Sequence, residues 1–189
     1  MDLLDVSRAV YSGLAVWPGS HNHLEVSFAK AMVAGDSCNV TRLCMGMHTG
    51  THLDAPRHYL QEGKTIDEYP LDRFQGKCQV VDCASCGPLI SRQILEERVS
   101  TSETDAVWIY TGTCPPSSQK FIPNFASLSL DAAEFLCERG LQMVGIDTYS
   151  VEAFHSVEHP VHKTLLGSDV LILENLLLDG VAPGLYGFF

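Results

Sequence analysis

The stretch that decides the fold is His48-Thr49-Gly50-Thr51-His52-Leu53-Asp54-Ala55-Pro56-Arg57-His58. Its three histidines and one aspartate fall at even positions, spaced four, two and four residues apart. Imidazole and carboxylate groups are the ligands that suit zinc, manganese or iron. Ordinary packing explains such a concentration of these side chains poorly, so the spacing favours a metal site.

A straight strand could not bring these side chains to one ion. Side chains alternate along a strand, so His48, His52 and Asp54 would share one face. His48 and Asp54 would nevertheless lie about 20 Å apart, at roughly 3.3 Å per residue, and metal bonds of about 2.1 Å cannot span that distance. We therefore expect the chain to curl at Gly50 and any regular structure to end at Pro56. Alternatively, His48 and His52 could share one face of a helical turn.

Length and composition limit the class of protein. The 189 residues suit a single domain, 1–189, and a hydrophobic content of 46% is ordinary for a globular core. The formal net charge of −11 argues against nucleic acid or an anionic membrane as the main partner, and is compatible with binding divalent cations. No apolar run approaches the length of about 18 residues that a transmembrane helix needs.

The first residues and the cysteines indicate the cellular compartment in which the protein is expected. The first residues, Met-Asp-Leu-Leu-Asp, lack the basic start of a signal peptide. The seven cysteines are odd in number, and we expect them to be reduced thiols in a cytoplasmic protein. Cys83 and Cys86 form a CxxC with no second pair, so packing is expected there rather than a redox or zinc role.

Several segments have the patterns of regular structure. Period-two alternation over 39–47 predicts a strand that leads into His48, and a first strand is expected within 5–16. Helices are expected over 90–99 and 130–139, with Ser91 and Ser129 as N-caps.

Apolar runs at 106–110, 143–146 and 170–173 predict buried strands that end on polar residues. Glu174 follows the last run, and a carboxylate there is costly to bury unless it is paired or metal-bound. It is therefore a candidate ligand, with a strand end facing water as the alternative. Among the later histidines, His162 in the expected helical turn 160–166 is the best candidate when taken together with Glu174.

Trp17-Pro18-Gly19 predicts a tight loop that carries a large aromatic ring. The ring could simply pack against the core, or it could form a wall of a pocket for an aromatic substrate. Composition alone favours packing.

Taken together, these features resemble the metal-dependent cyclase/hydrolase family. Residues 48–58 are similar to its long and specific HxGTHxDxPxH signature. The likeness runs along nearly the whole chain and includes Trp17-Pro18-Gly19, Thr111-Gly112, Gly145-Ile146-Asp147, and His162 followed by Leu-Ile-Leu-Glu-Asn at 171–175. Within the family, the chain is most similar to the bacterial arylformamidases.

The resemblance implies an α/β fold, a swivelling β/β/α domain whose central mixed sheet is flanked by helices. It implies a metal-dependent amidohydrolase that converts N-formyl-L-kynurenine to L-kynurenine and formate in tryptophan degradation. The substrate would be a small amide, no organic cofactor would be needed, and the protein would assemble as a homodimer or homotetramer.

Carried onto this sequence, the resemblance implies a metal site made of five residues. His48, His52 and Asp54 would bind a first ion. Asp54 and Glu174 would bridge to a second ion, which His162 would complete.

The resemblance also gives roles to two further residues. His58 would be the proton donor and acceptor, and Trp17 would contact the substrate, which reverses the preference for packing. The ion implied is Zn²⁺, one or two per chain, with Mn²⁺ in some relatives.

Two departures from the family pattern stand out. Relatives often have arginine before Thr-Gly, where this chain has Tyr110, and they continue beyond the last residues present here, Gly184-Leu185-Tyr186-Gly187-Phe188-Phe189. The chain is therefore expected to lack the usual C-terminal end. Two alternatives stay open: a family hydrolase acting on another small cyclic or linear amide or ester, and a metal-binding protein without turnover.

Overall fold

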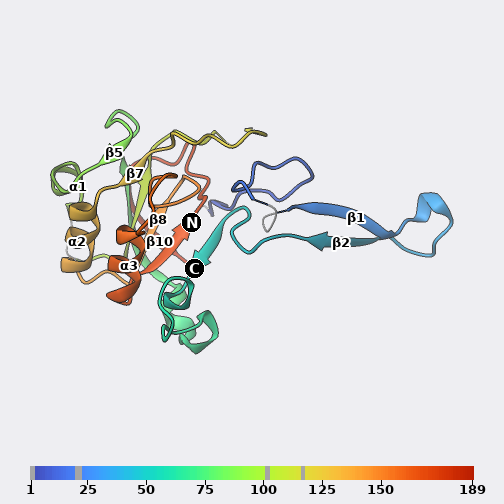
Figure 1. Ribbon diagram of the computed structural model, residues 1–189, viewed down its shortest axis with the longest axis horizontal. Helices are drawn as coiled ribbons and strands as arrows, with labels where there is room; N and C mark the ends of the chain where they lie inside the picture. Colours follow the sequence, from blue (N-terminus) through green and yellow to red (C-terminus); the bar gives the residue numbers. More distant parts are fainter. Residues whose placement is uncertain (1–2, 20–22, 101–102, 116–117) are drawn as a thin grey trace.

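A body built around one sheet and a projecting hairpin make up the computed structural model (Figure 1), which describes residues 3–19, 23–100, 103–115 and 118–189. The expected α/β class with a central mixed sheet is confirmed. The sheet has six strands in the order β10-β4-β6-β8-β9-β3. Their bounds are β3 (His52–Asp54), β4 (Gly76–Asp82), β6 (Ala106–Tyr110), β8 (Met143–Ile146), β9 (Leu171–Glu174) and β10 (Gly184–Phe188).

The centre of the sheet is parallel and both edges are antiparallel. Strands β4, β6, β8 and β9 run parallel, whereas β10 and β3 pair antiparallel at the two edges. Parallel strands are buried on both faces, which is why they read as continuous apolar runs. The three-residue edge strand β3 carries part of the His48–His58 stretch and places it beside the end of β9.

Three α-helices of the described chain pack on one face of this sheet: α1 (Arg92–Arg98), α2 (Leu130–Glu138) and α3 (Pro160–Gly167). Ser91 and Ser129 occupy the expected N-cap positions of α1 and α2, although neither side chain makes a capping hydrogen bond. The core on this face joins Leu95, Leu136 and Leu165 of the helices to strand residues, and each such fully buried leucine contributes roughly 1.5–3 kcal/mol. The strand residues are Val81, Val107, Ile109, Val144, Ile146 and Ile172.

The opposite face is covered without an α-helix in the described part of the chain. Its core includes Val80, Trp108, Met143 and Leu171, packed with Phe188 of the edge strand β10. Short 3₁₀ turns lie near this face and at the end of the His48–His58 stretch: η3 (Pro56–His58), η4 (Ile66–Glu68) and η5 (Leu71–Phe74). A two-stranded sheet of β5 (Leu89–Ile90) and β7 (Ser127–Leu128) completes the body.

The hairpin, here called the arm, comprises β1 (Glu25–Lys30), η2 (Met32–Ala34) and β2 (Val40–Cys44). Its strands form a sheet of their own and extend away from the body (Figure 1). Phe28 is 70% exposed and Val33 is 98% exposed. An isolated two-stranded hairpin is only marginally stable in water, so the arm would gain stability by packing on another surface.

The expected strand over 39–47 is confirmed as β2, whereas the strand expected within 5–16 is wrong. That segment is irregular and is held by Arg8, whose side chain donates to the carbonyl oxygens of Cys114 and Asp147 at 3.1 and 3.3 Å. The backbone N–H of Arg8 donates to Thr51 Oγ1 at 2.8 Å. The backbone bond to Thr51 fixes the segment against the His48–His58 stretch, and the side-chain bonds fix it against Cys114 and Asp147. Alternation in the sequence cannot reveal such contacts.

Among the described residues, no helix is both long and apolar enough to cross a membrane.

Candidate metal centre

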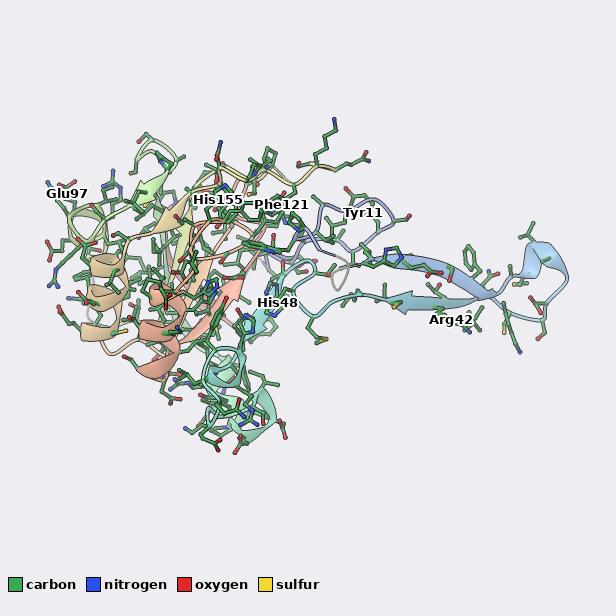
Figure 2. The ribbon with its side chains drawn as sticks, in the orientation of Figure 1. Tyr11, Arg42, His48, Glu97, Phe121 and His155 are labelled. Atoms are coloured by element: carbon green, nitrogen blue, oxygen red, sulfur yellow. The ribbon has the colours of Figure 1, made fainter. Side chains whose placement is uncertain are left out.

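The curl expected at Gly50 is present, and it lies where the arm joins the body, beside the labelled His48 (Figure 2). Gly50 has a φ of 67°, in the left-handed region, and a side chain there would meet Val10 Cγ2 at 3.0 Å. Both observations favour glycine at this position. The curl brings His48 Nδ1 within 3.3 Å of Asp54 Oδ1 instead of leaving the two residues at opposite ends of a strand.

His48, His52 and Asp54 form a trio with metal-like spacing. His48 Nδ1 and His52 Nε2 are 2.9 Å apart, and His52 Nε2 and Asp54 Oδ1 are 3.6 Å apart. Atoms bound at about 2.1 Å to one tetrahedral ion lie about 3.4 Å from one another. The three separations bracket that value, so the trio can hold one ion and leave a position open.

The second oxygen of Asp54 faces another group of side chains. Asp54 Oδ2 lies 3.9 Å from His162 Nε2 and 3.9 Å from His58 Nε2. It is buried and has no hydrogen-bond partner among the described residues. A buried, unpaired carboxylate oxygen is costly unless a cation satisfies it, so this atom fits a divalent ion between Asp54 and His162.

Glu174 closes the cluster because β3 pairs with β9, which places it opposite His52. Its Oε2 lies 3.4 Å from His52 Nε2, and its Oε1 lies 3.4 Å from His162 Nε2. Ligand atoms of His48, His52, Asp54 and Glu174 all lie within 4.8 Å of one another. The five residues singled out as ligands therefore lie together, and the cluster could bind a divalent metal; their roles as ligands stay a prediction.

The electrostatics of the cluster are those of a cation site. Burial by itself lowers the pKa of His52, but the hydrogen bond and charge of Glu174 outweigh it and raise this pKa to about 9. The same holds for His162: burial lowers its pKa, but Glu152, Glu174 and Asp54 outweigh burial and raise this pKa to about 9. Burial opposes ionisation of Glu174, yet the two histidines hold its pKa well below the usual range. Without an ion, protons supply the positive charge that these carboxylates require.

Known proteins share this arrangement of sequence and fold. Residues 4–153 match the sequence profile of the Cyclase family. The chain belongs to this family. A kynurenine formamidase from Salinibacter ruber is 31% identical to the chain over 186 residues, which cover 98% of the chain and 87% of that protein.

Solved structures also resemble this cyclase-family chain. A potential metal-dependent hydrolase with cyclase activity has a TM-score of 0.79 at 26% identity, covering 97% of the chain and 85% of that protein. Isatin hydrolase A from Ralstonia solanacearum has a TM-score of 0.76 at 18% identity, covering 96% and 81%. The likeness to isatin hydrolase A is a likeness of fold alone.

His58 lies at the edge of the centre of this cyclase-family protein. Its ring centroid is 4.2 Å from that of His48, and burial lowers its pKa from the usual value. Its side chain is 33% exposed, similar to the 35% of His48, whereas that of Asp54 is 3% exposed. It is therefore placed beside the cluster with access to solvent, and its role as proton donor and acceptor stays a prediction.

Two residues at the centre were not found from the sequence. Glu152 is buried and bonded to His162 Nδ1 at 2.8 Å, and Tyr59 packs its ring on His58 and His162 at centroid distances of 4.3 and 4.5 Å. The only sequence signal for Glu152 is a carboxylate ten residues before His162. Of the other late histidines, His155 is exposed and lies outside the centre.

Trp17 lies in an aromatic cluster with Phe121, Phe125 and Phe154, at centroid distances of 5.4, 6.0 and 5.1 Å. The cavity of about 470 Å³ over the candidate ligands is lined by residues of the 45–66 segment, and Trp17 borders a different cavity of about 480 Å³. The structure thus gives the ring packing partners, while its contact with a substrate stays a prediction.

We expect the cyclase-family chain, stripped of metal with a chelator, to be most stable between pH 4.5 and 6.5. The pKa values of His52 and His162 are about 9 in the folded protein, against 6.5 for an unperturbed imidazole. Their stabilisation is therefore complete below pH 6.5 and is lost as the pH rises to 9. Glu174 has a lowered pKa in the folded protein, so its contribution to stability is complete above pH 4.5 and is lost on acidification.

The melting temperature of the chelated protein, followed across this pH range, tests the expectation. A melting temperature that does not fall between pH 6.5 and 9 contradicts it. Repeating the series with saturating zinc is the control, because the ion replaces the protons and should flatten the alkaline loss.

Proposed function

We propose that this chain is a metal-dependent amidohydrolase that cleaves the formyl amide of N-formyl-L-kynurenine to give L-kynurenine and formate. The observation that carries the proposal is the convergence of imidazole nitrogens and carboxylate oxygens around the unpaired Asp54 Oδ2. The similarity to a kynurenine formamidase over 98% of the chain supports the substrate.

The residues present account for the chemistry. When bound, a divalent ion here supplies Lewis acidity, which polarises an amide carbonyl and makes hydroxide available near neutral pH. His48, His52, Asp54, His162 and Glu174 would hold it. His58 Nε2 would take the proton of the attacking water and deliver it to the departing nitrogen, because an amide anion is a very poor leaving group.

Zn²⁺ is the proposed ion, one or two per chain, with Mn²⁺ as the alternative. Three imidazoles and two carboxylates are ligands that zinc accepts, whereas a set with more oxygen would suit manganese better. Metal analysis of the purified protein, after reconstitution with each ion separately, tests the choice.

The substrate is tested with a panel. N-formyl-L-kynurenine, a formylated aniline, isatin as a cyclic amide, and an aryl ester are each assayed with the zinc-loaded protein. Preference for N-formyl-L-kynurenine is expected. Preference for another member favours the alternative of a family hydrolase for a different small amide or ester, and binding of metal without turnover of any member favours a non-catalytic metal-binding protein.

We further propose that Trp17 stacks on the aniline ring of the substrate. Trp17→Ala is expected to raise KM for N-formyl-L-kynurenine far more than it changes kcat or metal content, because stacking acts on binding. Phe125→Leu, which alters the same aromatic cluster and keeps Trp17, is the control. Unchanged KM in Trp17→Ala means that the ring only packs.

A second copy of this chain is the partner that we propose for the arm. The arm exposes Phe28 and Val33, and its charges cancel, Glu25 and Asp36 against Lys30 and Arg42, in a chain of net charge −11. A neutral apolar arm can dock on an acidic copy of its own chain without added repulsion. A homodimer or homotetramer is therefore expected.

Light scattering at micromolar concentration measures the assembly. The double variant Phe28→Ser/Val33→Asp should reduce the measured mass to that of one chain. The same kind of change on the body, Val157→Asp at a residue that is 82% exposed, should not. A wild-type protein with the mass of one chain refutes the proposal.

The cytoplasm is the proposed compartment. All seven cysteines are free, and three of them are buried: Cys78, Cys83 and Cys114. Free thiols persist in a reducing compartment, and a disulfide in protein isolated under non-reducing conditions would count against this location.

A further inference from the structure

The carboxylate of Glu152 is saturated with hydrogen bonds beneath His162. Glu152 is 4% exposed. Its Oε1 accepts from Ser156 Oγ at 2.8 Å and from the backbone N–H of Val161 at 3.3 Å. Its Oε2 accepts from the backbone N–H of His162 at 3.4 Å and from His162 Nδ1 at 2.8 Å. One buried side chain therefore holds both the first turn of α3 and the imidazole that this turn carries.

The bond to Nδ1 decides which ring nitrogen of His162 is free to bind a metal ion. With Nδ1–H donating to Glu152, the free lone pair is on Nε2. His162 Nε2 is the atom that lies 3.4 Å from Glu174 Oε1 and 3.9 Å from Asp54 Oδ2. The tautomer that Glu152 fixes at Nδ1 is thus the one in which Nε2 can bind a cation.

We propose that Glu152 is a positioning residue for metal binding, which fixes the tautomer and orientation of His162 so that Nε2 binds the ion shared with Asp54 and Glu174. This inference rests on the proposed function, because it requires that the centre hold metal. A carboxylate acceptor also makes an imidazole a stronger ligand than a neutral acceptor does.

The other enclosed histidine is anchored differently. His52 Nδ1 lies 3.0 Å from the backbone oxygen of Gly50, which leaves Nε2 to face the cluster. A change at Glu152 should consequently weaken the half of the centre that contains His162 and spare the half that contains His48 and His52.

A competing interpretation is that Glu152 itself binds an ion together with His159 and His162, whose ligand atoms also lie within 4.8 Å of one another. The hydrogen bonds argue against it. Both oxygens of Glu152 already accept from two donors each, and His159 Nδ1 is 3.8 Å away. An ion there would have to displace bonds that hold the start of α3.

Glu152→Gln is the decisive variant. An amide has lost the charge, and in either orientation its NH₂ faces an N–H that needs an acceptor. Zinc per chain is measured against a graded series of free zinc set by a competing chelator. The affinity of the position that contains His162 should fall about 10- to 100-fold, with the occupancy of the His48 and His52 position unchanged.

Two further variants separate positioning from simple loss of stability. Glu152→Asp keeps the charge and should recover part of the lost zinc affinity. Ser156→Ala removes one donor to the same carboxylate, keeps the bond to His162, and should bind zinc like the wild type. Equal zinc binding by Glu152→Gln and wild type overturns the inference.

Nitrogen NMR of the zinc-loaded wild-type protein gives a test that does not depend on a variant folding. His162 should show a protonated Nδ1 and a metal-bound Nε2, whereas metal on Nδ1 overturns the inference in favour of an ion on Glu152. Wild-type protein that takes up neither zinc nor manganese refutes the proposed function itself, an outcome distinct from zinc-loaded protein with normal affinity in Glu152→Gln.

Discussion

His52→Ala is expected to abolish both metal binding and hydrolysis. His52 Nε2 lies 2.9 Å from His48 Nδ1, 3.6 Å from Asp54 Oδ1 and 3.4 Å from Glu174 Oε2, so it contacts both halves of the cluster. Its removal leaves the trio with two ligands and two buried carboxylates with less compensation. Metal content after dialysis against zinc, and turnover of N-formyl-L-kynurenine, should both fall to background.

The matched control is His155→Ala, the same substitution at an exposed histidine that is outside the cluster. It should keep metal and activity. Full metal content in His52→Ala would remove His52 from the ligand set, and the trio would need another member.

His58→Asn is expected to keep its metal and to lose roughly 10²–10⁴-fold in kcat, the usual contribution of a general acid or base. His58 lies beside the trio: its Nε2 is 3.9 Å from Asp54 Oδ2, farther than any pair within the trio, and its side chain is partly exposed. His162 Nε2 is equally far from Asp54 Oδ2, so metal analysis, and not distance, separates a proton carrier from a ligand here. Burial lowers the pKa of His58, so near neutral pH the ring can accept a proton before it returns one.

An ester provides the control for this role. A phenoxide leaves more readily than an amide nitrogen, so the loss in His58→Asn should be smaller for an aryl ester than for the formyl amide. Protein that is purified without metal would make His58 a ligand, and equal losses on both substrates would remove it from protonation of the leaving group.

Some of the fold was predictable because the rules involved are local. Strands β6 and β8 are buried on both faces, so their sequences are continuous apolar runs. The curl at Gly50 followed from the reach of metal bonds, which no extended chain could satisfy for His48 and Asp54. Helix α2 begins after Ser129, as its capping residue indicates.

The failures occurred where a segment is held by distant parts of the chain. The segment within 5–16 resembles a strand in composition, yet Arg8 ties it to the carbonyl oxygens of Cys114 and Asp147. The arm is similar: alternation indicated β2 but gave no sign that, within the described chain, its sheet partner would be β1 alone.

The sequence by itself determined which atoms are available to a metal and that the chain must bend to gather the first three, because ligand chemistry and backbone reach act within a few residues. Tertiary structure alone decided the rest of the centre. The antiparallel pairing of β3 with β9 sets Glu174 opposite His52, and the bonds of Glu152 to α3 aim His162 at Asp54. Residues more than 100 positions apart meet there because burial of the sheet and its hydrogen bonds fix the register, which no local pattern encodes.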